Sequence, residues 1–192
     1  MHATREIVEL AESLGVDSII HEIAENRQEM DNESWAITPT AREYIAAVQP
    51  FAQASRRALS HGGAEQVLRG ALRLRMIELT ARWLRTGRQP LACHAGITNV
   101  HVGPRGGLWA CAVQARTHRM ANLREQGMDL GRALASESAS RVLRSIREQG
   151  CSCPLANQLY ANILMDPVEM VHVMALVARH GGAGLLRGEQ PG

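Results

Sequence analysis

Four cysteines constrain what this chain can fold into more than any other residues. They are Cys93, Cys111, Cys151 and Cys153, all in the second half of the sequence. The first two are separated by 17 residues (94–110), and a single residue separates the last two. Four thiolates that converge in space can hold a tetrahedral zinc ion or an iron–sulfur cluster. The pattern therefore predicts that two distant segments meet at one metal centre.

The N-terminal sequence favours a metal over disulfides. Residues 1–6 lack a basic segment followed by an apolar stretch, so we expect no secretory signal. No window approaches the ~20 apolar residues of a membrane helix, so we expect no membrane contact. These features indicate a soluble, cytoplasmic protein. Thiols stay reduced in that compartment, where clustered cysteines bind metal more often than they form structural disulfides.

Composition argues against nucleic acid as a partner. Aromatic residues are 3% of the 192 residues, which leaves no row of rings for stacking bases. The net charge is +2, and all 21 basic residues are arginine. They are dispersed among acidic residues, as on solvated helix faces. The length suits one domain or two small ones, with 45% hydrophobic residues to form a core.

Hydrophobic periodicity in the first half predicts helices and one short strand. A helix over Thr4–Leu14, capped by Thr4 and ended by Gly15, precedes a buried strand at Val16–Ile20. A polar stretch follows, and a second helix opens at Thr38-Pro39-Thr40 and runs toward Ser60 with a kink near Pro50. A third helix spans Ala64–Thr86 and ends at Gly87.

The second half predicts a hairpin followed by helices, so the expected fold class is α+β. Its predicted elements are a strand at Ile97–Val102, a turn at Gly103–Gly107, a strand at Leu108–Val113, a helix at Gly131–Gln149 and a last helix from Pro154 through Met165 that resumes at Asp166-Pro167 and runs to His180. Composition changes at Arg88-Gln89-Pro90. We therefore expect one domain over residues 1–90 and a second over residues 91–192.

The expected hairpin places the cysteines. Antiparallel pairing would bring Cys93 and Cys111 together at its open end. A Cys-x-Cys pair in extended backbone, such as Cys151 and Cys153, can direct both sulfurs to one centre, and Pro154 stiffens the exit. Three readings of the four cysteines stay open at this point. They are an iron–sulfur cluster, a structural zinc site, and ordinary buried cysteines.

The motifs resemble a known module. Cys93-x-x-Gly96, the strand to Val102, Pro104-x-Gly106, Trp109-x-Cys111 and Cys151-Ser152-Cys153-Pro154 together resemble the C-terminal auxiliary-cluster region of radical S-adenosylmethionine (radical SAM) enzymes. The resemblance is to the shorter "twitch" form of the SPASM domain, which carries one auxiliary [4Fe–4S] cluster. It implies that all four cysteines ligate that cluster, which serves electron transfer or substrate positioning.

The resemblance also implies an architecture and partners. Residues 1–90 would be the end of a partial (β/α) TIM barrel with bridging helices, and residues 91–192 the cluster domain. The substrate would be a small molecule or a peptide. An exposed barrel edge at Val16–Ile20 would favour association with a barrel-bearing partner chain or with a second copy.

One departure from the family concerns catalysis. The Cys-x-x-x-Cys-x-x-Cys loop that binds the catalytic cluster does not occur in these 192 residues. We therefore expect that the chain alone does not cleave S-adenosylmethionine, which would bind only in a complete enzyme. The expectation is a truncated product or one half of a split system. The alternative is a non-enzymatic zinc or cluster module that mediates assembly.

Several other residues are weaker candidates. His94 and His101 could approach the metal, but with four thiols available a supporting or surface role is the stronger expectation. His21 and Glu22 follow the predicted strand, where barrel enzymes place their sites, although an exposed loop explains them as well. Asn157 and Gln158 follow the cysteine loop and are candidate hydrogen-bond donors to it.

Overall fold

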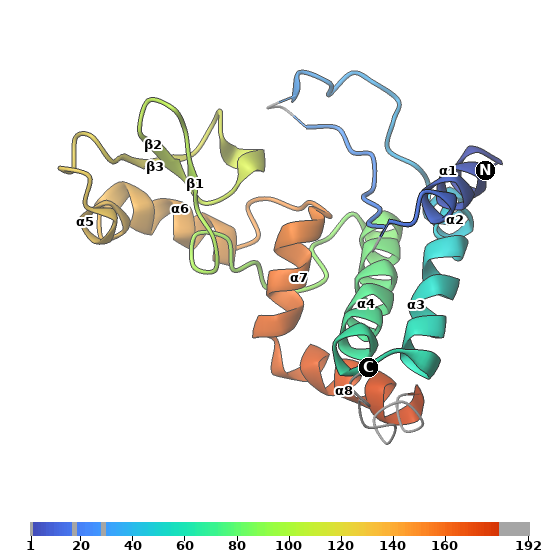
Figure 1. Cartoon of the computed structure of the whole chain (residues 1–192). Helices are drawn as coiled ribbons and strands as arrows, with labels where there is room; N and C mark the ends of the chain where they lie inside the picture. The colour runs from blue at the N-terminus through green and yellow to red at the C-terminus, as the bar shows by residue number, and fades with distance from the viewer. Residues whose placement is uncertain (1, 17–18, 28–29, 181–192) are drawn as a thin grey trace.

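The fold is α+β, as predicted, with many helices and one small antiparallel sheet (Figure 1). The structure is a computed structural model that describes residues 2–16, 19–27 and 30–180. Its elements are α1 (His2–Ser13), α2 (Ala41–Ala47), α3 (Gln49–His61), α4 (Ala64–Thr86), β1 (His101–Val102), β2 (Gly107–Trp109), the 3₁₀ turn η2 (Ala112–Gln114), β3 (Arg119–Asn122), α5 (Leu130–Leu134), α6 (Glu137–Arg147), α7 (Ala156–Met165) and α8 (Pro167–His180).

The predicted second helix is divided into α2 and α3. A capping box starts α2, in which the Thr40 hydroxyl accepts from the Glu43 amide and the Glu43 carboxylate accepts from the Thr40 amide. The break falls at Val48, and Pro50 lies in the first turn of α3. A proline is tolerated there because its missing N–H would have no partner in the helix. The predicted kink is therefore a break.

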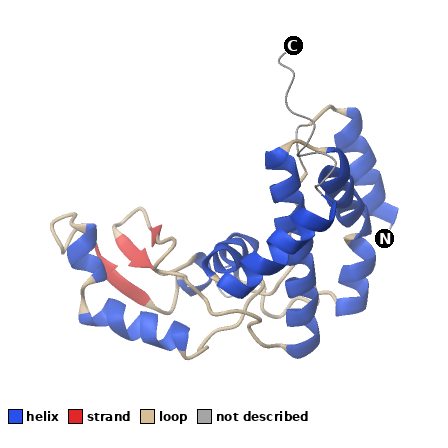
Figure 2. Cartoon of the chain, turned by 90° about the horizontal axis from the view of Figure 1, so that it is seen from below, coloured by secondary structure: helices blue, strands red, loops and turns tan. Residues whose placement is uncertain are grey.

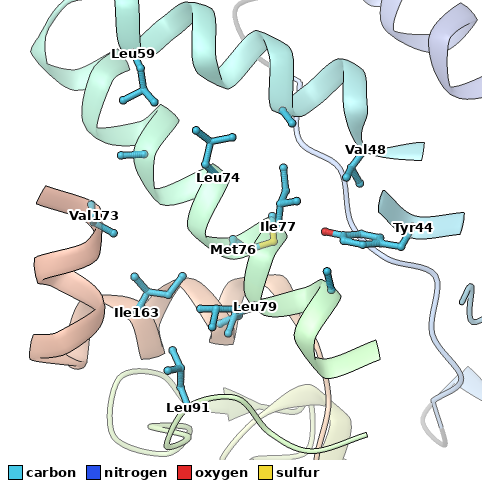
Figure 3. Packing of buried hydrophobic residues seen from close by; sticks show 14 of the residues in the cluster. Tyr44, Val48, Leu59, Leu74, Met76, Ile77, Leu79, Leu91, Ile163 and Val173 are labelled. Atoms are coloured by element: carbon cyan, nitrogen blue, oxygen red, sulfur yellow. The ribbon is translucent and has the colours of Figure 1, made fainter. Parts of the chain in front are cut away.

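The longest helix, α4, has the predicted bounds and lies at the centre of the main core (Figure 3). Gly87 ends it in the left-handed conformation, with φ 64°. Leu59 of α3 and Leu79 of α4 are fully buried, as are Ile163 of α7 and Val173 of α8. We call α2, α3, α4, α7 and α8 the helical body.

The last helix, α8, is joined to α4 by a partly buried ion pair. The Arg75 guanidinium donates to both carboxylate oxygens of Glu169, with 2.9 Å between Nη2 and Oε1. This guanidinium lowers the pKa of Glu169.

In the part of the chain that the structure describes, no single helix is long and apolar enough to cross a membrane, although α7 and α8, bent by 93°, pass that test as a pair.

The N-terminal segment departs from the predicted barrel unit. The first helix is confirmed, but it begins by His2, so Thr4 lies inside it and is not its cap. Val16, Ile19 and Ile20 belong to a loop, while positions 17–18 of the predicted strand lie outside the described residues. Among the described residues before 101 there is no strand to pair with this segment, which explains why it does not form one. The partial barrel is not confirmed.

The predicted hairpin is present but shorter than expected. β1 pairs with β2 through His101↔Trp109 and Val102↔Leu108 only. Residues 97–98 form a turn instead, because their amides both bond the His94 carbonyl oxygen. The prediction also missed β3, which pairs antiparallel with β2 and completes the sheet (Figure 2).

The predicted helix over Gly131–Gln149 consists of α5 and α6. The Ser136 hydroxyl accepts from the Ala139 amide and starts α6, so the chain breaks between the two helices. Val142 and Ile146 of α6 pack with Met120 of β3 in a second core. We call β1, β2, β3, α5 and α6 the sheet lobe.

The buried clusters divide the chain differently from its order in sequence. The main core combines residues before position 90 with α7 and α8, and the smaller cores lie within residues 95–146. The sheet lobe is thus inserted between two parts of the helical body. The predicted boundary between two domains at residue 90 stays a prediction.

Candidate metal centre

Cys93 and Cys111 meet in the core of the sheet lobe. Cys111 is buried directly after β2, and Cys93 packs against the same cluster. The turn after Cys93 depends on Gly96, which has φ +81°, and a Cβ there would lie 2.5 Å from Leu143. Neither cysteine lies in the strand ladder. The expectation that strand pairing joins them is therefore wrong, and the turn and η2 bring them together.

Cys151 and Cys153 lie in the loop between α6 and α7, which is held against the end of α4. The Ser152 hydroxyl accepts from Trp83 Nε1 at 2.8 Å and donates to the Gly87 carbonyl oxygen at 3.2 Å. The Cys153 amide donates to Gln89 Oε1 at 3.1 Å. These bonds fix the Cys-x-Cys segment to the helical body on one side and leave its thiols to meet the sheet lobe.

Burial is the main influence on three of the four thiols, with smaller contributions from other thiols of the set. Burial raises the pKa of Cys111, and the thiolates of Cys151 and Cys93 raise it further. Burial and Cys93 raise the pKa of Cys151. Burial raises the pKa of Cys153 to about 12, with added contributions from Glu25, Cys111 and Cys151. Such mutual effects require short separations, because charge interactions weaken with distance. All four cysteines are free.

Gln114 connects two of these cysteines. Its Nε2 donates to Cys151 Sγ at 3.7 Å, and its backbone amide bonds the Cys111 carbonyl oxygen. The same amide also favours the Cys111 thiolate and so lowers the pKa of that thiol, although burial outweighs it. Gln114 is itself buried. Its side chain therefore orients the Cys151 sulfur relative to Cys111.

Four buried polar atoms have no partner in the described part of the chain. They are His94 Nδ1, Gln114 Oε1, Gln158 Oε1 and Asn162 Nδ2. Asn162 Oδ1 accepts from the His94 amide at 2.9 Å and from Gln158 Nε2 at 2.9 Å, which links α7 to the residue after Cys93. Two of the four residues, His94 and Gln114, thus adjoin a cysteine in sequence or by a hydrogen bond.

The four thiols do not form a ready-made site for a single metal ion. In the described residues, no three or more His, Cys, Asp or Glu side chains are arranged to hold one metal ion. A [4Fe–4S] cluster places each thiolate on a different iron, so its ligands stand further apart than those of a single zinc. Four free, mutually interacting thiols with amide donors around them are the ligands and second layer that such a cluster uses.

The remaining sequence candidates lie in different surroundings. His101 is exposed in β1, and Asn157 is exposed on α7. Gln158 is buried and bonds Asn162, as described above, instead of a thiol. His21 and Glu22 line a separate cavity. Of the weaker candidates, His94 and Gln158 are therefore the two that border the cysteine site.

Sequence reasoning missed Gln114, Gln89 and Asn162. Gln114 and Asn162 are polar residues in otherwise apolar surroundings, which is a weak signal without knowledge of the fold. Gln89 lies in the segment that was assigned only as a boundary. Their roles depend on contacts between segments far apart in sequence, which periodicity does not encode.

No family model, curated protein or solved structure matches the chain. The resemblance to the twitch domain therefore remains a prediction that rests on the cysteine, glycine and proline motifs of the sequence. The positions of the four cysteines in the structure are an observation that does not depend on this resemblance.

Proposed function

We propose that Cys93, Cys111, Cys151 and Cys153 bind one [4Fe–4S] cluster, which serves electron transfer or substrate positioning beside a separate catalytic centre. The observation that carries this proposal is that Cys93 and Cys111 pack in one cluster, while Gln114, three residues after Cys111, donates a hydrogen bond to Cys151 of the Cys-x-Cys pair. The resemblance to the auxiliary-cluster domain of radical SAM enzymes supports the same function.

The residues of the site would act on the cluster in defined ways. A bound [4Fe–4S] cluster supplies one-electron redox chemistry. The four thiols, whose pKa values are raised at three of the four positions, would release protons as they become ligands. Gln114 would keep its hydrogen bond to Cys151 Sγ, and the apolar residues around Cys111 would limit access of water.

The proposal assigns no cleavage of S-adenosylmethionine to this chain, because the Cys-x-x-x-Cys-x-x-Cys loop is absent from its sequence. A partner chain that carries a catalytic barrel would supply that step and the site for a small-molecule or peptide substrate. The role of the four cysteines is then to hold a redox centre at the junction of the sheet lobe and α4.

Single substitutions test whether the four cysteines act as one site. We expect Cys93→Ser, Cys111→Ser, Cys151→Ser and Cys153→Ser each to lose most of the iron and sulfide after anaerobic reconstitution, since a four-ligand site is cooperative. The matched control is Asn157→Ala, an exposed position near the cysteine loop, which should retain the iron content of the unmodified chain.

Unequal losses would argue against the proposal. If two of the serine variants kept full iron and sulfide, the cysteines would not form one site. If the unmodified chain took up one zinc ion in place of iron and each serine variant lost that zinc, the structural zinc module would be the better account. Circular dichroism of each variant separates loss of metal from loss of fold.

A further inference from the structure

A second cavity lies on the helical body, among α1, residues 19–24, α2 and α3. Its volume is about 610 Å³, which is within the range of small-molecule sites. The lining is largely apolar and includes Ile23, Val48 and Phe51. None of the four cysteines takes part, so this cavity is distinct from the candidate metal centre.

Three of the six aromatic residues of the chain lie at this cavity or beside it, and the three Trp lie elsewhere. The sequence has one Phe and two Tyr. Phe51 and Tyr44 line the cavity, and Tyr160 lines a smaller neighbouring cavity of about 210 Å³ that shares His21 and Phe51 with it. The His21 ring stacks on Phe51, with centroids 4.6 Å apart and planes 25° apart. Phe51 and both Tyr therefore supply an aromatic wall to this part of the helical body.

The polar groups that face the cavity floor are uncharged. His21 Nε2 lies 3.4 Å from the Tyr44 hydroxyl. Burial, with a smaller contribution from Arg73, lowers the pKa of His21 to about 4, so its ring is neutral at physiological pH. Burial raises the pKa of Tyr44 to about 12, so its hydroxyl stays protonated. Both groups offer hydrogen bonds without adding charge.

The charge of the lining is negative. Glu22 and Glu43 line the cavity, and no arginine does among the described residues. The Thr40 amide and hydroxyl both bond Glu43 Oε2, which lowers the pKa of Glu43 and keeps it ionised. An apolar, aromatic hollow with carboxylates at its rim complements a ligand with an apolar body and a positive group.

We propose that this cavity binds a small aromatic amine. Its aryl ring packs beside the His21–Phe51 stack, and its protonated nitrogen faces the carboxylates of Glu22 and Glu43. The site discriminates against carboxylic acids of the same shape, because two carboxylates would repel them. This inference is independent of the proposed cluster, since it uses no residue of that site.

Calorimetric titration of the full-length chain with three matched probes tests the ligand class. The probes are 1-naphthylmethylamine, 1-naphthalenemethanol and 1-naphthoic acid, which share the ring system and differ in charge. We expect the amine to bind most tightly, the alcohol more weakly and the acid not measurably. Equal affinities for the amine and the acid, or no binding of the amine, would overturn the proposal.

Two carboxylate variants locate the binding. Glu43→Gln keeps a side chain that can complete the capping box, and Glu22→Gln changes an exposed carboxylate. We expect each variant to lower the affinity for the amine about three- to fivefold, which is the scale of one exposed charge pair, and to leave the affinity for the alcohol unchanged. Glu125→Gln, exposed in the sheet lobe, is the matched control and should change neither. An equal effect of Glu125→Gln would contradict the assigned site.

Phe51→Leu tests the aromatic wall. We expect this variant to lower the affinity for the amine and for the alcohol alike, by roughly fivefold, because both probes lose the same ring contact. A thermal unfolding curve of the variant reports whether the helical body is intact. A folded Phe51→Leu protein with undiminished affinity for both probes would show that they bind elsewhere.

Discussion

Gln114 makes the one side-chain hydrogen bond to a thiol that the described residues show. Its position follows from the short 3₁₀ turn after Cys111, which aims the side chain toward Cys151. Hydrogen bonds to a ligand sulfur stabilise the reduced form of a cluster, because that form carries more negative charge. A single amide can therefore change a redox potential without touching metal.

Replacing Gln114 by leucine should lower the midpoint potential of the reconstituted protein while iron and sulfide contents stay near those of the unmodified chain. The measurement is a redox titration followed by electron paramagnetic resonance. Gln126→Leu, in a surface turn of the same lobe, serves as the control and should leave the potential unchanged. An unchanged potential for Gln114→Leu at full iron content would contradict the assigned role.

His21 gives the helical body a predictable dependence on pH. Its pKa in the folded chain is about 4, against an ordinary value of 6.5, because burial and then Arg73 disfavour the charged ring. The unfolded chain therefore takes up the proton first as pH falls. Tyr44 and Tyr160, which border the ring, remain uncharged in this range, since burial raises the pKa of both.

The free energy of unfolding should consequently be highest above pH 6.5 and fall between pH 6.5 and 4. The His21 share of that loss should be about 1–2 kcal/mol after allowance for partial exposure to solvent. Urea denaturation at several pH values measures it. The His21→Gln variant should lose this part of the pH dependence, whereas His118→Gln, exposed in the sheet lobe, should retain it. Identical slopes for both variants would contradict the assignment.

Among the secondary-structure elements, α3 and α4 approach each other most closely at Gly70. A Cβ at this position would lie 2.8 Å from the Ser55 carbonyl oxygen and 3.5 Å from the Ala58 side chain. The glycine lowers the helix propensity of α4 but permits the two helices to touch. Backbone contact of this kind requires the smallest residue.

Gly70→Ala should destabilise the chain despite its better helix propensity. The gain in propensity is about 1 kcal/mol, and separating two packed helices costs about 1–3 kcal/mol, so we expect a net loss of up to about 2 kcal/mol. Denaturant unfolding measures the change. The control is Gly63→Ala, where a Cβ meets nothing within 4 Å, and its effect should stay below about 1 kcal/mol. A stabilised Gly70→Ala protein would contradict the close packing.

Helices were more predictable than strands because their signals are local. The Thr40–Glu43 capping box and the left-handed Gly87 mark helix ends within a few residues, so α2 and α4 begin or end where the sequence indicates. A strand needs a partner supplied by another segment. Val16–Ile20 has the composition of a strand, but the described residues before position 101 contain no strand that could pair with it. Arg119–Asn122 pairs with β2 although its sequence carries no clear alternation.

At the scale of the whole molecule, the cysteine site lies where the sheet lobe meets the helical body (Figure 1). The His94–Asn162 and Gln114–Cys151 hydrogen bonds cross this junction, and an ion pair between Arg116 and Asp31 connects the lobe to the loop before α2. The site thus depends on both parts of the chain. Its assembly requires the fold, because no single segment contains all four thiols.

The cysteines could be identified as candidate ligands from the sequence, because all four lie in the second half of the chain and each pair has glycine and proline nearby. Their surroundings could not, since Gln114, Gln89 and Asn162 reach the site only through tertiary contacts. The cavity near His21 could not be predicted from the sequence either. It arises from the packing of a loop against α2 and α3, and the sequence indicated only that His21 and Glu22 deserved consideration.

Metal analysis of the anaerobically purified, full-length chain tests the central claim most directly. The account predicts a brown protein with about four iron and four acid-labile sulfide atoms per chain, as one [4Fe–4S] cluster requires, and little zinc. A colourless protein with one zinc per chain would contradict it, as would a folded protein that takes up neither metal on reconstitution.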